Sequence, residues 1–140
     1  MKISLSIGIN RFGAIDAPLS GCVNDAKAMQ AYFDARGYET ATLLDDAATR
    51  GAVADWMAHA AARATANEVS HIALSLSSHG TQLRDLNDDE ADKWDEAAVL
   101  YDTAIVNGQW GNVLLDDAVK AWLASIPKTT EVELWFDCCH

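Results

Sequence analysis

Apolar residues recur along the chain with two different periods, which predicts alternating strands and helices. Every second residue from Ile3 to Ile9 is apolar, as in a strand, and the next apolar stretch has helical spacing. Gly37 is placed to end this first helix, and Thr49 to cap a second one. The predicted strands are 3–9, 38–44, 71–77, 98–101 and 132–136, and the predicted helices cover 23–33, 49–60 and 115–126.

This order of elements predicts an α/β fold in three layers, with a mostly parallel sheet covered by helices on both faces. Residues 80–97 are polar and acidic with little apolar periodicity, and we expect them to form a loop. The sequence contains no internal repeat, low-complexity tract or linker. Residues 1–140 are therefore expected to form one domain.

The charge balance narrows the possible partners. Acidic residues outnumber basic ones by 21 to 10, which leaves a net charge of −11. This disfavours nucleic acid and favours cationic partners, such as metal ions or substrates that carry Arg or Lys. No stretch approaches the ~20 apolar residues of a membrane span. The three cysteines, two of them adjacent, make a poor disulfide framework, so the expected location is the reducing cytoplasm.

Two of the predicted strands end in residues that could do chemistry. The third strand runs into His79, and the last one runs into Cys139. If these strands are neighbours and parallel, the two side chains meet at one edge of the sheet. An imidazole can take the proton of a thiol and later protonate a leaving amine. The backbone N–H groups of Gly80 and Cys139 would then hold the oxyanion of an attacked carbonyl.

The residues around these strand ends resemble the motifs of metacaspases and of their bacterial relatives, the orthocaspases. The resemblance rests on five segments that occur in the family's order and extend along the whole chain. They are Leu19-Ser20-Gly21-Cys22-Val23-Asn24-Asp25-Ala26, Ser77-Ser78-His79-Gly80-Thr81, Asp92-Lys93-Trp94-Asp95-Glu96-Ala97, Leu114-Leu115-Asp116-Asp117 and Asp137-Cys138-Cys139-His140. The chain is thus similar to the catalytic large-subunit region of these caspase-like peptidases, and their fold is the one expected here.

The resemblance implies a role for each matching position. His79 would be the general base and acid and Cys139 the nucleophile, whereas Cys138 occupies a variable position of the motif. The pocket for the residue before the scissile bond would be lined by Cys22, Asp25, Ser77 and Asp137. Carboxylates in such a pocket attract Arg or Lys and repel Asp. The expected partners are therefore protein or peptide substrates with Arg or Lys at the cleavage site.

The resemblance also implies a calcium site, and no organic cofactor. Positions that bind calcium in calcium-dependent metacaspases correspond to Asp95, Asp116 and Asp117. Hard carboxylate oxygens suit this ion. The same stretch contains further acidic residues, at Asp85, Asp88, Asp89, Glu90 and Asp92. We expect calcium to stimulate the peptidase; the alternative is a solvated acidic loop that holds no ion.

Three features depart from the family's pattern. Ser78 stands where the family has Gly beside the histidine, and Lys93 places a positive charge among the proposed calcium ligands. The chain ends at His140, whereas the family continues into the small-subunit region that completes the substrate groove. We therefore expect a domain that is incomplete at its C-terminus.

Other classes of function stay open at this point. One is a receiver-like α/β signalling module, in which acidic residues surround a phosphorylated Asp. Another is an inactive caspase-like module that binds calcium or a partner. A zinc site from Cys138, Cys139 and His140 is the least favoured, because adjacent side chains cannot easily converge on one tetrahedral ion.

Overall fold

The computed structural model describes residues 1–84 and 94–139, with the backbone alone at 82–84, 94, 95 and 139. Strands and helices alternate over residues 2–84, as the apolar periodicity predicts. The elements are β1 (Lys2–Gly8), α1 (Cys22–Asp34), β2 (Glu39–Leu44), the 3₁₀ turn η1 (Asp45–Ala47), α2 (Arg50–Thr65), β3 (His71–Arg84), β4 (Trp94–Val106), β5 (Gln109–Leu115), α3 (Asp116–Ser125) and β6 (Glu131–Cys139).

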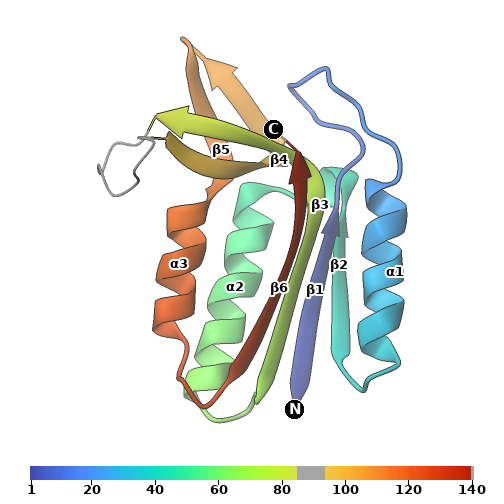
Figure 1. The fold of residues 1–140 in the computed structure, drawn as a ribbon, viewed down its shortest axis with the longest axis vertical. Coiled ribbons are helices and arrows are strands. Elements are labelled where there is room, and N and C mark those ends of the chain that lie inside the picture. The colour runs from blue at the N-terminus through green and yellow to red at the C-terminus, as the bar shows by residue number, and fades with distance from the viewer. Residues whose placement is uncertain (85–93, 140) are drawn as a thin grey trace.

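The sheet has a parallel part and an antiparallel part. Strands β2, β1, β3 and β6 lie side by side in this order, and each pair is parallel (Figure 1). The last residues of β3, from Gly80, pair antiparallel with β4, which forms a hairpin with β5. The predicted neighbourhood of the third and last strands is confirmed, because β3 and β6 pair from His71–Glu131 to His79–Cys139.

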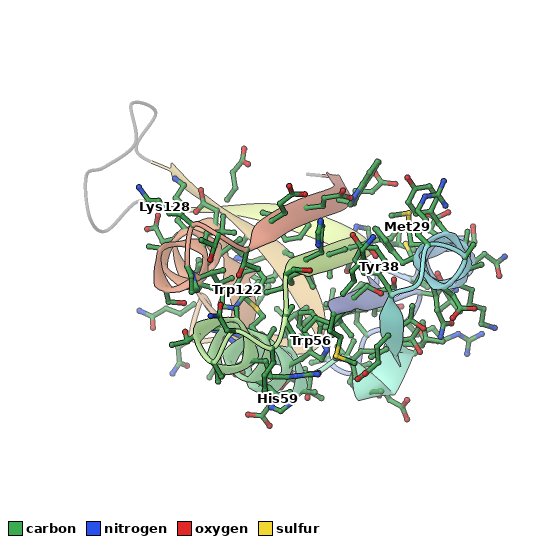
Figure 2. All side chains as sticks on the ribbon, turned by 90° about the horizontal axis from the view of Figure 1, so that it is seen from below. Met29, Tyr38, Trp56, His59, Trp122 and Lys128 are labelled. Atoms are coloured by element: carbon green, nitrogen blue, oxygen red, sulfur yellow. The ribbon has the colours of Figure 1, made fainter. Side chains whose placement is uncertain are left out.

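Helices cover both faces of the parallel part. Seen from below, α1 lies on one side of the sheet and α2 and α3 lie together on the other (Figure 2). Met29 and Tyr38 belong to the small apolar cluster on the α1 side, and the larger core on the other side includes Trp122. The indole N–H of Trp122 donates a 2.6 Å hydrogen bond to the carbonyl of Met57, which ties α3 to α2. The predicted three-layer α/β architecture is confirmed.

The alternation of β1 explains why α1 lies so close to the sheet. Ile3, Leu5 and Ile7 point into the main core, so the residues between them face α1. Those residues are serines, followed by Gly8. A Cβ at Gly8 would lie 2.7 Å from the Cβ of Ala26 and would also collide with the carbonyl oxygen of Cys22. The first turns of α1 therefore rest directly on the backbone of β1.

Two predictions made from the sequence are wrong. The expected loop at 80–97 begins too early and ends too late, since β3 continues to Arg84 and β4 starts at Trp94. Strand β5, Gln109–Leu115, was not predicted at all. Most of its residues are exposed or half-buried, so a strand that pairs mainly with its own hairpin partner shows no apolar alternation. The acidic residues at 85–92 and Lys93 lie outside the described residues.

Within the described residues, no helix is both long enough and apolar enough to cross a membrane.

Candidate active site

β3 and β6 bring His79 and Cys139 into register at the point where their parallel pairing ends. Along the parallel ladder Ser77 pairs with Asp137, Ser78 with Cys138 and His79 with Cys139. Paired strands lie ~4.8 Å apart, so the two backbones are neighbours at the same end of the sheet (Figure 1). A dyad would have been excluded if His79 and Cys139 lay at opposite ends of the sheet, but the two residues lie at the same end. The structure describes the backbone of Cys139 but not its side chain.

The imidazole of His79 is held on two sides by the loop that joins β1 to α1. Its Nε2 lies 2.8 Å from the carbonyl oxygen of Ala17, and the ring of Phe12 packs against it at a centroid distance of 5.5 Å. A carbonyl oxygen only accepts hydrogen bonds, so Nε2 must carry the proton. In the neutral ring Nδ1 is then the unprotonated nitrogen, which can accept a proton from a thiol.

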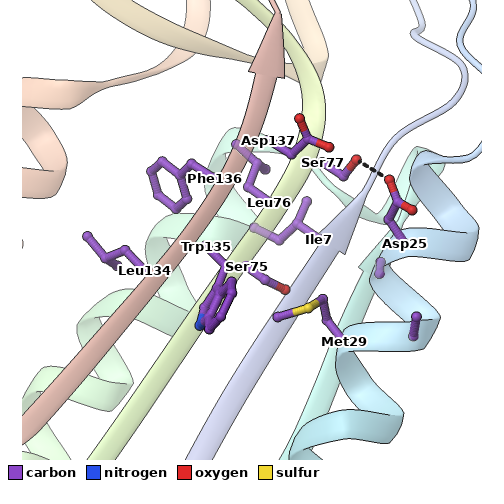
Figure 3. A pocket seen from close by; sticks show the side chains of 12 residues that line it. Ile7, Asp25, Met29, Ser75, Leu76, Ser77, Leu134, Trp135, Phe136 and Asp137 are labelled. Atoms are coloured by element: carbon purple, nitrogen blue, oxygen red, sulfur yellow. Dashed lines mark hydrogen bonds between the residues drawn. The ribbon is translucent and has the colours of Figure 1, made fainter.

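A pocket of about 480 Å³ opens beside these strand ends, between α1, β3 and β6 (Figure 3). Asp25 from the first turn of α1, Ser77 and Asp137 all line it. These three residues are predicted to surround the residue before the scissile bond, and that role of the pocket stays a prediction. The Ser77 hydroxyl donates a 3.1 Å hydrogen bond to Oδ2 of Asp25. Both Asp25 and Asp137 are exposed to solvent, so the pocket has an anionic, hydrated mouth.

The deeper part of the pocket was not foreseen from the sequence. Met29, Ser75 and Trp135 line it below the carboxylates (Figure 3). Ser75 is 3% exposed, and its hydroxyl finds no hydrogen-bond partner among the described residues. The register of β3 with β6 could have indicated Ser75 and Trp135, because they are paired two positions before Ser77 and Asp137. The contribution of Met29 depends on where α1 crosses the sheet, which no local pattern contains.

Comparison with known proteins supports the same family as the motifs. The model of the caspase domain family matches residues 1–140. The chain is 31% identical to metacaspase-2 of Trypanosoma brucei brucei over 148 residues, which are 98% of this chain and 40% of that protein. It is 32% identical to metacaspase-1 of Cryptococcus neoformans over 149 residues, 99% of this chain and 31% of that one.

A crystal structure of a protein from Geobacter sulfurreducens has the same fold, with a TM-score of 0.80 and 31% identity over 99% of this chain and 50% of that chain. The chain belongs to the caspase domain family. It spans 40% or less of the length of the metacaspases named above. The receiver-like alternative is not supported by this membership.

Two other residues that match metacaspase motifs, Cys22 and Gly80, do not line the pocket. Cys22 is buried at the start of α1 and does not line the pocket, although the sequence predicts that it does. Its backbone N–H donates to the side chain of Asn10. Gly80 follows His79 and pairs with Ala98 of β4. Its position next to the imidazole fits the predicted oxyanion donor, and its role stays a prediction.

Two of the three proposed calcium ligands lie at the start of α3, on the other side of the sheet from the pocket. Asp116 and Asp117 form its first turn. Oδ1 of Asp116 is buried and has no hydrogen-bond partner among the described residues, while Oδ2 lies 3.6 Å from the ammonium of Lys120. A second cavity of about 180 Å³ is lined by Asp116, Glu96 and Cys138. The side chain of Asp95 is not described.

These residues fit a cation only in part. An unpaired carboxylate oxygen is a suitable ligand for a hard ion. Residues 1–81 and 96–138, whose side chains the structure describes, contain no group of three or more His, Cys, Asp or Glu side chains that could hold a metal ion. A complete calcium site would need oxygen ligands beyond those described.

Proposed function

We propose that this chain is the catalytic part of a cysteine endopeptidase that cleaves after Arg or Lys with a His79–Cys139 dyad and is stimulated by calcium. The observation on which this rests is the β3–β6 register. It pairs His79 with Cys139 two residues beyond the Ser77–Asp137 pair that lines an anionic pocket. A nucleophile, a base and a pocket for a cation thus meet at one end of one sheet.

The hydrogen bond from Nε2 of His79 to the carbonyl oxygen of Ala17 leaves Nδ1 as the nitrogen that can act as the base. Nδ1 takes the proton of the Cys139 thiol, and the thiolate adds to the carbonyl carbon of the scissile peptide. Collapse of this adduct breaks the C–N bond, and the imidazolium returns its proton to the leaving amine. Water then hydrolyses the thioester, with the imidazole as base. The N–H groups of Gly80 and Cys139 would stabilise the oxyanion.

The pocket supplies the preference for a cationic side chain. Asp25 and Asp137 attract a guanidinium or an ammonium, and an Asp side chain of a substrate would meet two like charges. Arg can pair with a carboxylate through two parallel hydrogen bonds, which Lys cannot, so Arg is the preferred residue. The bond from Ser77 keeps the Asp25 carboxylate in place for this contact.

The calcium part of the proposal concerns Asp95, Asp116 and Asp117. Bound calcium would neutralise carboxylates near the start of α3. Within the described residues, the buried Oδ1 of Asp116 supports it.

Three variants of the complete protein test the dyad. Cys139→Ala and His79→Ala should each abolish cleavage of an Arg peptide, and the two losses should be of similar size because residues that act as a unit are not additive. Cys138→Ala is the control, because it removes a thiol directly beside the proposed nucleophile and leaves Cys139 in place. This variant should retain most of the activity. A dead Cys138→Ala beside an active Cys139→Ala would show that the register of the motif is wrong. A wild type without any cleavage would leave the inactive caspase-like module as the function.

A further inference from the structure

One residue, Asn10, lies at the start of the loop between β1 and α1 and is hydrogen-bonded to the other end of the loop. The side-chain Oδ1 of Asn10 accepts hydrogen bonds from the N–H groups of Cys22 (2.9 Å) and Val23 (3.3 Å), at the start of α1. Its carbonyl oxygen accepts a 2.7 Å bond from the N–H of Leu19. Asn10 therefore holds the end of the loop and the first turn of the helix at once.

Asn10 is itself held by a residue from a different part of the chain. Oδ1 of Asp45, in η1 after β2, accepts from the N–H groups of Asn10 (2.8 Å) and Arg11 (3.2 Å). Asp45 has a positive φ of 47°, a conformation that Asp tolerates better than most residues. The carboxylate thus fixes the backbone from which the Asn10 side chain reaches α1.

This arrangement replaces an ordinary helix cap. The N-cap of α1 is Gly21, in a left-handed conformation with φ 99°, and it has no side chain to bond the free N–H groups. Thr49 caps α2 in the usual local way, accepting a 3.2 Å bond from the N–H of Ala52. The cap of α1 instead comes from a residue just beyond the end of β1, so it fixes the helix relative to the sheet as well as satisfying its first turn.

Both parts that Asn10 holds belong to the proposed site. Asp25 lies on the first turn of α1, where its N–H bonds the carbonyl of Gly21 at 2.8 Å and its carboxylate meets Ser77. Ala17, whose carbonyl contacts His79, lies two residues before Leu19. A shift of Asn10 would therefore move the specificity carboxylate and the partner of the imidazole together.

We infer that Asn10, anchored by Asp45, is a positioning residue that sets the tautomer of His79 and the place of Asp25. Its action on substrate rests on the proposed peptidase, but its action on the imidazole does not. The hydrogen bonds that Asn10 makes to Asp45, Leu19, Cys22 and Val23 are called the clamp below. Loss of the clamp would let the carbonyl of Ala17 move away from Nε2 of His79 and let the first turn of α1 move away from Ser77. The two effects have separate readouts.

The test compares variants of the complete protein. In Asn10→Ala, the ¹⁵N spectrum of the His79 ring (assigned with His79→Gln) should lose its preference for a proton on Nε2, and KM for an Arg peptide should rise several-fold. Asn10→Asp keeps an acceptor oxygen and should preserve both properties. In Asp45→Gly the glycine tolerates the positive φ, and the His79 spectrum and KM should both change in the same direction as in Asn10→Ala. This variant replaces Asn10→Ala in the test if Asn10→Ala does not fold. Thr49→Ala, which uncaps α2, should lower Tm without either change.

The outcomes separate the inference from the proposed function. Asn10→Ala and Asp45→Gly could lower Tm as Thr49→Ala does and still give the His79 spectrum of the wild type. In that case the hydrogen bonds of Asn10 are only structural, and the inference is overturned. If the spectrum changes as expected but the wild type cleaves no peptide, the inference about His79 stands and the proposed peptidase fails. A changed spectrum with an unchanged KM overturns the part of the inference that concerns Asp25.

Discussion

The carboxylates of Asp25 and Asp137 lie at the mouth of their pocket and are exposed to water. This exposure sets the size of the effect that each can have on substrate selection. A fully desolvated charge pair loses several kcal/mol when one partner is removed, whereas an exposed pair contributes about 0–1 kcal/mol. The hydrogen bond from Ser77 orders Asp25 and places its contribution towards the upper end of the exposed range.

Asp25→Ala should therefore lower kcat/KM for an Arg peptide by roughly three- to fivefold, at about 1.4 kcal/mol per factor of ten. The loss should be mainly in KM, because in the proposed complex the carboxylate would contact the side chain of the substrate and not the reacting atoms. The assay uses peptides that differ only in the residue before the scissile bond. Asp34→Ala, an exposed carboxylate at the other end of α1, is the control with the same change of charge. Equal losses in the two variants would remove Asp25 from the pocket's function.

Among the residues that the structure describes, Tyr38 has a pKa displaced from its ordinary value. Burial raises the pKa of its phenol above the usual 10.0, and the nearby carboxylates of Glu133 and Glu131 raise it further. The folded state thus holds the phenolic proton more tightly than the unfolded state does. The resulting stability is present below about pH 10 and is lost as the pH rises from there through the folded pKa.

Tyr38→Phe should remove this alkaline loss. We expect the denaturation midpoint of the wild type to fall more steeply than that of Tyr38→Phe as the pH rises above about 9 to 10. Urea unfolding at a series of pH values measures both curves. Parallel curves would mean that the phenol ionises as readily in the folded protein as in the unfolded chain.

Among the helices and strands, the position of α1 depends on residue 8 being a glycine, which has no side chain. Gly8 ends β1 directly beneath the helix, where a Cβ would collide with the carbonyl of Cys22 and the side chain of Ala26. Ala26 is itself 1% exposed, so it has no free space into which to move. Any larger residue at position 8 would have to lift the first turn of α1, which also contains Asp25.

Gly8→Ala should destabilise the protein by about 1–3 kcal/mol, the usual cost of overpacking a close contact. It should also raise KM for an Arg peptide, since the lifted turn moves Asp25. Gly51→Ala in α2 is the matched control, because a Cβ there meets nothing within 4 Å. Chemical denaturation and peptide cleavage measure the two effects. A Gly8→Ala protein as stable as Gly51→Ala would show that α1 does not rest on β1 as tightly as the fold indicates.

Elements with a strong local signal could be predicted from the sequence, and those held by distant contacts could not. The alternation of Ile3–Ile9 indicates β1, the φ of 82° at Gly37 agrees with its predicted place at the end of α1, and Thr49 caps α2 as expected. β5 was missed because its residues mostly face solvent.

The same division applies to the candidate site. The resemblance indicates His79, Asp25 and Asp137 because each lies in a short segment whose residues match a motif of the family. The clamp of Asn10 by Asp45 joins residues 35 positions apart, and the contact of His79 with Ala17 spans 62 positions. Such contacts depend on how the loop folds back over the sheet, and no periodicity of the sequence contains that information.

At the scale of the whole molecule, a net charge of −11 attracts any cation, so a specific calcium site must be distinguished from this general field. The general attraction is screened beyond ~8 Å at physiological ionic strength, whereas direct coordination by carboxylate oxygens is screened much less. Calcium that binds specifically should therefore remain bound when salt is added.

Calorimetry on the complete protein at ~0.15 M salt should show calcium binding with a Kd between about 1 µM and 1 mM. Asp116→Ala and Asp117→Ala should each weaken it at least tenfold, because each removes ligand oxygens and not only a charge. Asp55→Ala changes the net charge equally from an exposed position on α2 and should leave the affinity nearly unchanged. Equal weakening in all three variants would mean that calcium only neutralises the acidic surface. Cleavage that persists unchanged in a chelator would separate the peptidase from calcium altogether.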